Sequence, residues 1–147
     1  MLFGVKKLRM LCIHCDYFSY ITTRKTEIAE KADEECKRCA VKDALVIFVT
    51  VEKYDEKDVN KIVHKSIEEI QSITKRLGVK EVILFPFAHL SEEIGNPNIA
   101  IKILQDLYEQ LKKMGYSVCK APFGWEKIFS LTSKGHPLSE SLRIIKP

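Results

Sequence analysis

Residues 44–51 have the sequence Ala-Leu-Val-Ile-Phe-Val-Thr-Val, a continuous run that is rich in β-branched side chains and apolar except for Thr50. A continuous run of this kind is typical of a strand that is covered on both faces. Downstream, apolar residues recur at helical spacing over 58–77, and Gly78 follows as a stop signal, so this segment is predicted to be a helix. Residues 81–85 then predict a second buried strand.

The same alternation continues towards the end of the chain. Asn96 and Pro97 are typical of a helix start, an apolar stripe runs from there to Met114, and residues 116–120 predict another strand. The order strand, helix, strand, helix, strand favours right-handed crossovers and a parallel core, which is an α/β fold. Upstream, residues 10–14 and 17–22 predict two short strands, and the highly charged residues 23–42 predict a mobile loop.

With 147 residues, the chain is long enough for one domain, which we place at residues 9–147 after an N-terminal extension over residues 1–8. No apolar run approaches the roughly 20 residues that cross a bilayer, and no signal peptide is recognisable, so we expect a cytoplasmic protein without a membrane partner. Of the net charge of +4, residues 1–42 carry +3, residues 43–114 carry −2 and residues 115–147 carry +3. An anionic partner is therefore expected to meet the two ends of the chain.

Two Pro-Phe turns follow predicted strands, at Pro86-Phe87 and Pro122-Phe123. If both strands are parallel, both turns lie beyond their carboxyl ends, where open α/β sheets usually bind ligands. Polar residues follow each turn: His89 after the first, and Glu126 with Lys127 after the second. The cluster at residues 134–140 is close enough in sequence to join the same edge.

The five cysteines offer a different interpretation, because four of them form two C-x-x-C pairs, at 12/15 and 36/39, separated as in a zinc ribbon. A zinc knuckle needs a turn between its cysteines, but residues 12–15 continue an apolar strand, where residues three apart point to opposite faces. We therefore expect no metal. The sequence also lacks a Gly-rich phosphate loop, a dinucleotide fingerprint and the common hydrolase and zinc-enzyme motifs.

Four segments together resemble a known family: residues 13–17 (Ile-His-Cys-Asp-Tyr), 86–91 (Pro-Phe-Ala-His-Leu-Ser), 121–127 (Ala-Pro-Phe-Gly-Trp-Glu-Lys) and 134–140 (Lys-Gly-His-Pro-Leu-Ser-Glu). They are similar, in order and spacing, to the amino-terminal editing domain of archaeal threonyl-tRNA synthetases. The resemblance implies a D-aminoacyl-tRNA deacylase-like α/β fold with a mixed sheet and two crossover helices. It covers essentially the whole domain, about residues 9–147.

The resemblance also implies a function, proofreading by hydrolysis of mischarged L-seryl-tRNA(Thr). Serine is threonine without one methyl group, and a pocket built for threonine rejects it by only about 1–3 kcal/mol. In the family the RNA assists: the 2′-hydroxyl of the terminal adenosine helps to place the attacking water, and no cofactor is needed. Two alternatives stay open, a stand-alone D-aminoacyl-tRNA deacylase and a zinc-dependent RNA-binding module without catalysis.

The implied site places Lys127 near the substrate's side-chain hydroxyl, and His89 and Glu140 near the aminoacyl group and its amine. Glu126 departs from the family, in which this position often carries tyrosine. The implied partners are the acceptor end of tRNA(Thr) carrying serine, a second copy of the chain in a homodimer, and the rest of a threonyl-tRNA synthetase. By resemblance, the catalytic residues are Lys127 and His89, and the substrate-binding residues are Ala88, Pro122, Phe123, Glu126, His136 and Glu140.

Overall fold

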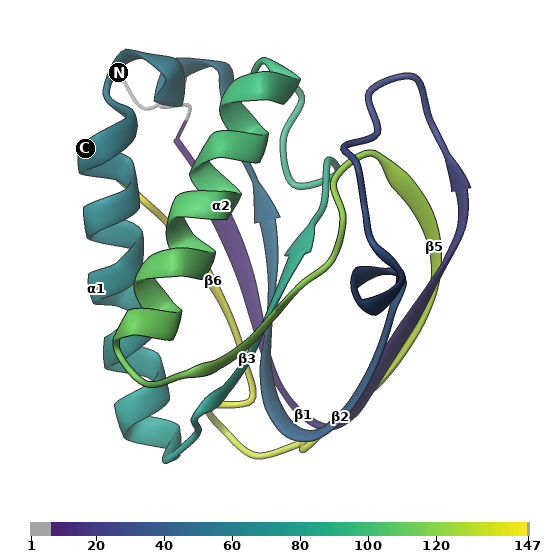
Figure 1. Cartoon of the computed structure of the whole chain (residues 1–147). Helices are drawn as coiled ribbons and strands as arrows, with labels where there is room; N and C mark the ends of the chain where they lie inside the picture. The colour runs from purple at the N-terminus through teal and green to yellow at the C-terminus, as the bar shows by residue number, and fades with distance from the viewer. Residues whose placement is uncertain (1–6, 147) are drawn as a thin grey trace.

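The computed structural model describes residues 7–146 and builds from them a six-stranded sheet with two helices on one face (Figure 1). The strands run in the order β4-β3-β2-β1-β5, and β6 also pairs with β1. The β2–β3 and β3–β4 pairs are parallel, and the three pairs that involve β1 are antiparallel. The elements are β1 (Arg9–Lys25), η1 (Glu34–Lys37), β2 (Arg38–Thr50), η2 (Lys53–Lys57), α1 (Val59–Leu77), β3 (Glu81–Pro86), α2 (Pro97–Lys113), β4 (Ser117–Lys120), β5 (Trp125–Ser133) and β6 (Glu140–Ile144).

Both predicted helices are confirmed, and Gly78, Asn96 and Pro97 lie at their ends as predicted. The Asp58 side chain accepts the backbone N–H of Lys61 at the start of α1, and Gly78 ends that helix at φ 68°. The Asn96 side chain accepts a backbone N–H at the start of α2, where Pro97 is the first helical residue. The sequence therefore placed both crossovers within a residue or two.

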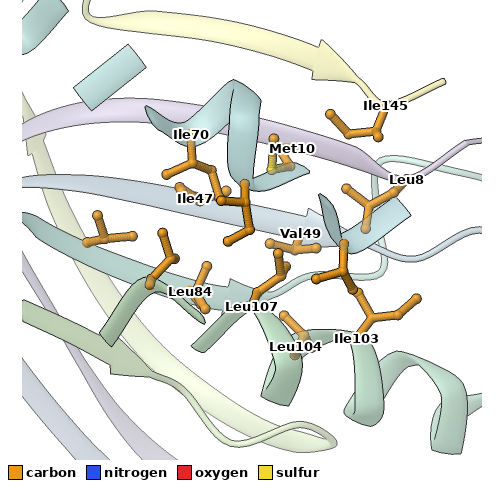
Figure 2. Close-up of a cluster of buried hydrophobic side chains, with 14 of the residues drawn as sticks. Leu8, Met10, Ile47, Val49, Ile70, Leu84, Ile103, Leu104, Leu107 and Ile145 are labelled. Atoms are coloured by element: carbon orange, nitrogen blue, oxygen red, sulfur yellow. The ribbon is translucent and has the colours of Figure 1, made fainter. Parts of the chain in front are cut away.

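Buried side chains form two clusters, one on each face of the sheet. The larger cluster lies between the sheet and the inner faces of α1 and α2, and Figure 2 shows Ile47, Val49 and Leu84 of the sheet beside Leu104 and Leu107 of α2. The smaller cluster lies on the helix-free face and is rich in aromatic rings, among them Phe18, Phe48 and Phe85. The run at 44–50 is buried throughout because β2 contributes to both clusters.

The first part of the chain differs from the prediction. Residues 10–14 and 17–22 belong to one strand, β1, whose register shifts between Cys15 and Tyr17. The shift reverses which alternate residues face the helices, so the hydrophobic alternation breaks and resembles two separate strands. The prediction of a loop over 23–42 was also wrong in part, because β1 continues to Lys25 and β2 already begins at Arg38.

Leu8 joins the core, although the sequence placed it in an extension. Its side chain is fully buried, its N–H donates to Asp55 Oδ1 at 3.0 Å, and its carbonyl accepts the N–H of Ile145 at 2.8 Å. These contacts fix the start of β1 beside the end of β6. Residues 1–6 of the expected extension lie outside the described residues.

Candidate active site at the carboxyl ends of the parallel strands

A cavity of about 420 Å³ lies at the edge of the sheet where β2 and β3 end, the edge to which their arrowheads point in Figure 1. Its volume is within the range of roughly 300–1,000 Å³ that is usual for small-molecule sites. Both predicted turns contribute to its wall, Pro86-Phe87 after β3 and Phe123 after β4. The lining residues are Thr26, Ile28, Val49, Thr50, Val51, Phe85, Pro86, Phe87, Ala88, His89, Ile94, Gly95, Pro97, Ala100, Leu104, Phe123, Gly124, Trp125, Glu126, Lys127 and Phe129.

Lys127 brings a positive charge into this mostly apolar wall. Its Nζ donates to the carbonyl of Trp125 at 2.7 Å and lies 5.2 Å from the centre of the Phe85 ring. Burial lowers the pKa of the Lys127 ammonium to about 8, an effect that the negative charge of Glu30 partly offsets. A lysine in this state is charged at neutral pH but poorly hydrated, so it interacts strongly with polar groups of a bound ligand.

The other predicted residues near the two turns lie at different depths. His89 and Ala88 are exposed at the rim, and the His89 ring packs against Phe87 with 5.0 Å between ring centres. Glu126 also lines the cavity but turns outward to Arg24, with 3.2 Å between Arg24 Nη2 and Glu126 Oε1. Pro122, which directly precedes Phe123, is buried and does not line the cavity.

His136 and Glu140 do not join this edge within one chain, contrary to the expectation from their closeness in sequence. Lys127 pairs with Thr22 of β1, whereas Glu140 pairs with Ile13, nine residues away on the same strand. At about 3.3 Å per residue the two positions are roughly 30 Å apart along β1.

The residues around His136 and Glu140 have partners of their own. His136 Nε2 lies 2.9 Å from His14 Nδ1, and His14 Nε2 lies 2.9 Å from Asp43 Oδ1. The hydrogen bond with His14 lowers the pKa of the Asp43 carboxyl. Glu140 accepts a hydrogen bond from the Ser133 hydroxyl at 2.9 Å. These contacts fix the loop between β5 and β6.

Residues 26–30 include a part of the cavity wall that the sequence did not reveal. This segment lies in the predicted mobile loop, yet Thr26 and Ile28 line the cavity and Glu30 holds the second Pro-Phe turn from behind. The contacts join positions more than 90 residues apart, and several of them use backbone atoms. The one local feature of the sequence that could have indicated a close contact at this turn is Gly124, a glycine directly after a Pro-Phe pair.

The four C-x-x-C sulfurs do not converge on one point. Cys12 packs in the cluster beneath the helices, and Cys15 packs in the cluster on the opposite face, as the strand pattern predicted. Cys39 also belongs to the helix-free side, in β2, and Cys36 lies in η1. Within residues 7–146, no group of three or more His, Cys, Asp or Glu side chains is arranged to hold a metal ion.

The chain is thus a small α/β domain with a cavity beyond the carboxyl ends of its parallel strands β2 and β3. A family model for the archaea-specific editing domain of threonyl-tRNA synthetase matches residues 8–145. The chain belongs to this family of editing domains. That is the class of enzyme domain that the four sequence segments indicated.

Similar proteins agree with this assignment. The chain is 43% identical over 138 residues to a threonine–tRNA ligase of Methanosphaera stadtmanae, covering 94% of this chain and 22% of that protein. It is 43% identical over 141 residues to a threonine–tRNA ligase of Pyrococcus furiosus, covering 95% of this chain and 23% of that protein. The chain therefore spans less than a quarter of the length of these relatives.

Among solved structures, the c-Myc DNA Unwinding Element Binding Protein superimposes with a TM-score of 0.64 at 11% identity, covering 95% of this chain and 99% of that chain. At this identity the likeness concerns the fold alone. The α/β fold with a mixed sheet and two crossover helices, predicted from the sequence, is confirmed. Neither helix in the described part of the chain is long and apolar enough to cross a membrane.

Proposed function

We propose that this domain hydrolyses L-seryl-tRNA(Thr) and spares L-threonyl-tRNA(Thr). Membership of the editing-domain family supports proofreading, and the observation that carries the proposal is the cavity wall with its half-buried Lys127. The acceptor end of tRNA(Thr) enters at the rim near Ala88 and His89, and the ammonium of Lys127 binds the side-chain hydroxyl of the seryl group. A second site of this kind removes the serine product that the synthetic site cannot reject by binding alone.

The cavity favours attack by water over attack by a protein nucleophile. Its two hydroxyl groups are already committed as donors, Thr26 to the carbonyl of Gly124 and Thr50 to the carbonyl of Phe87. The lining residues include neither serine nor cysteine. The 2′-hydroxyl of the terminal adenosine places the water, the water oxygen adds to the ester carbonyl, and the 3′-oxygen leaves with a proton. No covalent enzyme intermediate forms in this route.

A direct comparison of substrates tests the proposal. We expect purified domain to release serine from L-seryl-tRNA(Thr) at least about 100-fold faster than threonine from L-threonyl-tRNA(Thr), because threonine carries one further methyl group into the closed wall. A D-aminoacyl-tRNA in the same assay distinguishes the alternative deacylase. Faster release of the D-amino acid, or equal release of serine and threonine, contradicts the proposal.

We further propose that the domain works in the cytoplasm, as part of a threonyl-tRNA synthetase and as a homodimer. The helix-free face supports the dimer, because β6 exposes Leu142 and Ile144 there, with 52% and 41% of their surface accessible. Glu140 lies on the same strand. A second copy seated on this face brings its Glu140 towards the first copy's cavity, which accounts for its distance from Lys127 within one chain.

Mixing two inactive variants tests the shared site. If each site takes Lys127 from one chain and Glu140 from the other, a mixture of the Lys127→Met and Glu140→Gln variants forms hybrid dimers in which one site is intact. The mixture is then expected to recover about one quarter of the wild-type rate of serine release, the statistical yield for a two-fold symmetric dimer. The variants are mixed, exchanged by mild denaturation and refolding, and assayed.

Each variant taken through the same refolding step alone is the control and is expected to stay inactive. A mixture as inactive as its components shows that Glu140 does not act across an interface. Analytical ultracentrifugation that finds only monomer at assay concentration contradicts the dimer itself.

A further inference from the structure

Residues 26–30 pack closely against the turn that leads into β5. Thr26 donates both its N–H and its hydroxyl to the carbonyl of Gly124, at 2.9 and 2.6 Å. Further along, the N–H of Glu30 donates to the carbonyl of Phe123 at 2.9 Å. The two segments approach so closely that a Cβ on Gly124 would lie 2.5 Å from the Cα of Ala29. The turn is therefore held from one side by a segment about 95 residues earlier in the chain.

Glu30 contributes most of the side-chain contacts in this arrangement. Its Oε2 accepts the N–H of Phe123 at 2.6 Å, and its Oε1 lies 3.6 Å from the ammonium of Lys120. Its backbone carbonyl accepts the indole N–H of Trp125 at 2.8 Å. The side chain is only 17% exposed, so these hydrogen bonds are shielded from competing water.

The same turn carries the acceptor for Lys127. The Nζ of Lys127 donates to the carbonyl of Trp125, and the indole of Trp125 is bound to Glu30. The negative charge of Glu30 also raises the pKa of Lys127, which opposes the lowering of this pKa by burial. Glu30 does not line the cavity, so any effect it has on a ligand passes through the turn and through Lys127.

We propose that Glu30 is a positioning residue for Lys127: it fixes the Phe123–Trp125 turn from which the ammonium is held, and it is the acidic group whose charge acts on that ammonium. The kinetic test of this inference rests on the proposed function, but the claim that Glu30 acts on Lys127 does not. A buried cation without a nearby acid gives up its proton more readily. The negative charge of Glu30 therefore favours the protonated form of Lys127 and partly offsets the effect of burial on its pKa.

The test compares Glu30→Gln with the wild-type protein by NMR, using side-chain ¹⁵N-labelled lysine to titrate Lys127. Glutamine keeps an oxygen acceptor for the Phe123 N–H but removes the charge, so we expect the pKa of Lys127 to fall by about half a unit or more. The Lys127→Arg variant identifies the resonance by its loss. Glu34→Gln is the matched control, because Glu34 is an exposed acid in the following η1 and pairs with Lys37.

Kinetics then separate the charge of Glu30 from its hydrogen bonds. For Glu30→Gln, the basic limb of the rate of serine release against pH is expected to move down with the pKa of Lys127. For Glu30→Ala, which also loses the bond to Phe123, kcat/KM is expected to fall at least about 10-fold further. In a Lys127→Met background, Glu30→Gln is expected to add no loss.

Two results overturn the inference. One is a pKa of Lys127 that is the same in Glu30→Gln as in the wild-type protein, and the other is an additive loss in the double variant. If the domain hydrolyses no aminoacyl-tRNA at all, the proposed function fails, while the NMR titration still decides whether Glu30 controls Lys127.

Discussion

Lys127→Met is expected to slow the release of serine from L-seryl-tRNA(Thr) at least about 100-fold, because an ammonium in a water-poor wall contributes several kcal/mol to binding and orienting a polar group. Methionine fills nearly the same volume and has no charge. Hydrolysis of preformed L-seryl-tRNA(Thr), followed by release of labelled serine under single-turnover conditions, measures the loss. Lys102→Met is the matched control, because Lys102 lies on the exposed side of α2 and pairs with Asp106.

The same substitution is expected to raise the stability of the fold. The pKa of Lys127 is about 8 in the folded domain and about 10.5 in the unfolded chain, so the unfolded chain binds more protons between these two values. Below pH 8 the desolvated charge opposes folding fully, and this cost disappears as the pH rises towards 10.5. Allowing for partial exposure, Lys127→Met should therefore raise the free energy of unfolding at pH 7 by about 1–2 kcal/mol.

Urea denaturation at pH 7 and pH 10 measures this gain, which should shrink at the higher pH. A variant that loses activity together with stability would show that Lys127 supports the fold rather than the reaction. Undiminished serine release by a stable variant would remove Lys127 from the site.

The strands and helices between residues 44 and 120 could be predicted from sequence because each is specified locally, whereas β5 and β6 were not predicted. Residues 58–77 carry an apolar stripe between Asp58 and Gly78. The run at 44–51 is continuous rather than alternating, which predicts a strand that is buried on both faces. The full length of β1 could not be predicted, because the register shift after Cys15 interrupts the alternation of this strand. The ends of β1 and β2 that extend past the core are charged and exposed, which is also the composition of a loop.

The site divides in the same way. Sequence predicted the edge of the sheet and the residues that follow its two Pro-Phe turns, since parallel strands end together. It did not predict Thr26 or Glu30, whose contacts with the turn are made largely through backbone atoms and depend on the path of the whole chain. It also placed Glu140 near Lys127 from closeness in sequence, whereas the pairing of β5 and β6 with different parts of β1 separates the two.

Gly124→Ala is expected to damage both the fold and the site. Gly124 has φ 79°, a conformation that costs an L-residue roughly 1–2 kcal/mol, and the new Cβ would lie 2.5 Å from Ala29 Cα and 2.6 Å from the carbonyl oxygen of Ile28. Because both obstacles are backbone atoms, the 26–30 segment must move away from the turn. We expect the free energy of unfolding to fall by about 2–4 kcal/mol and serine release to fall about 100-fold, since a shift of 1 Å in a site has effects of that size.

Gly78→Ala separates backbone strain from the loss of this packing. Gly78 has a similar φ of 68° at the end of α1, but an added Cβ there meets no atom within 4 Å. It should therefore lose only about 1 kcal/mol of stability and keep wild-type serine release. Chemical denaturation and single-turnover assays of both variants give the comparison. If Gly124→Ala behaves like Gly78→Ala, the packing of residues 26–30 against the turn does not shape the cavity. If only Gly124→Ala loses activity, and circular dichroism shows that its helices stay folded, the reaction requires the precise position of residues 123–127.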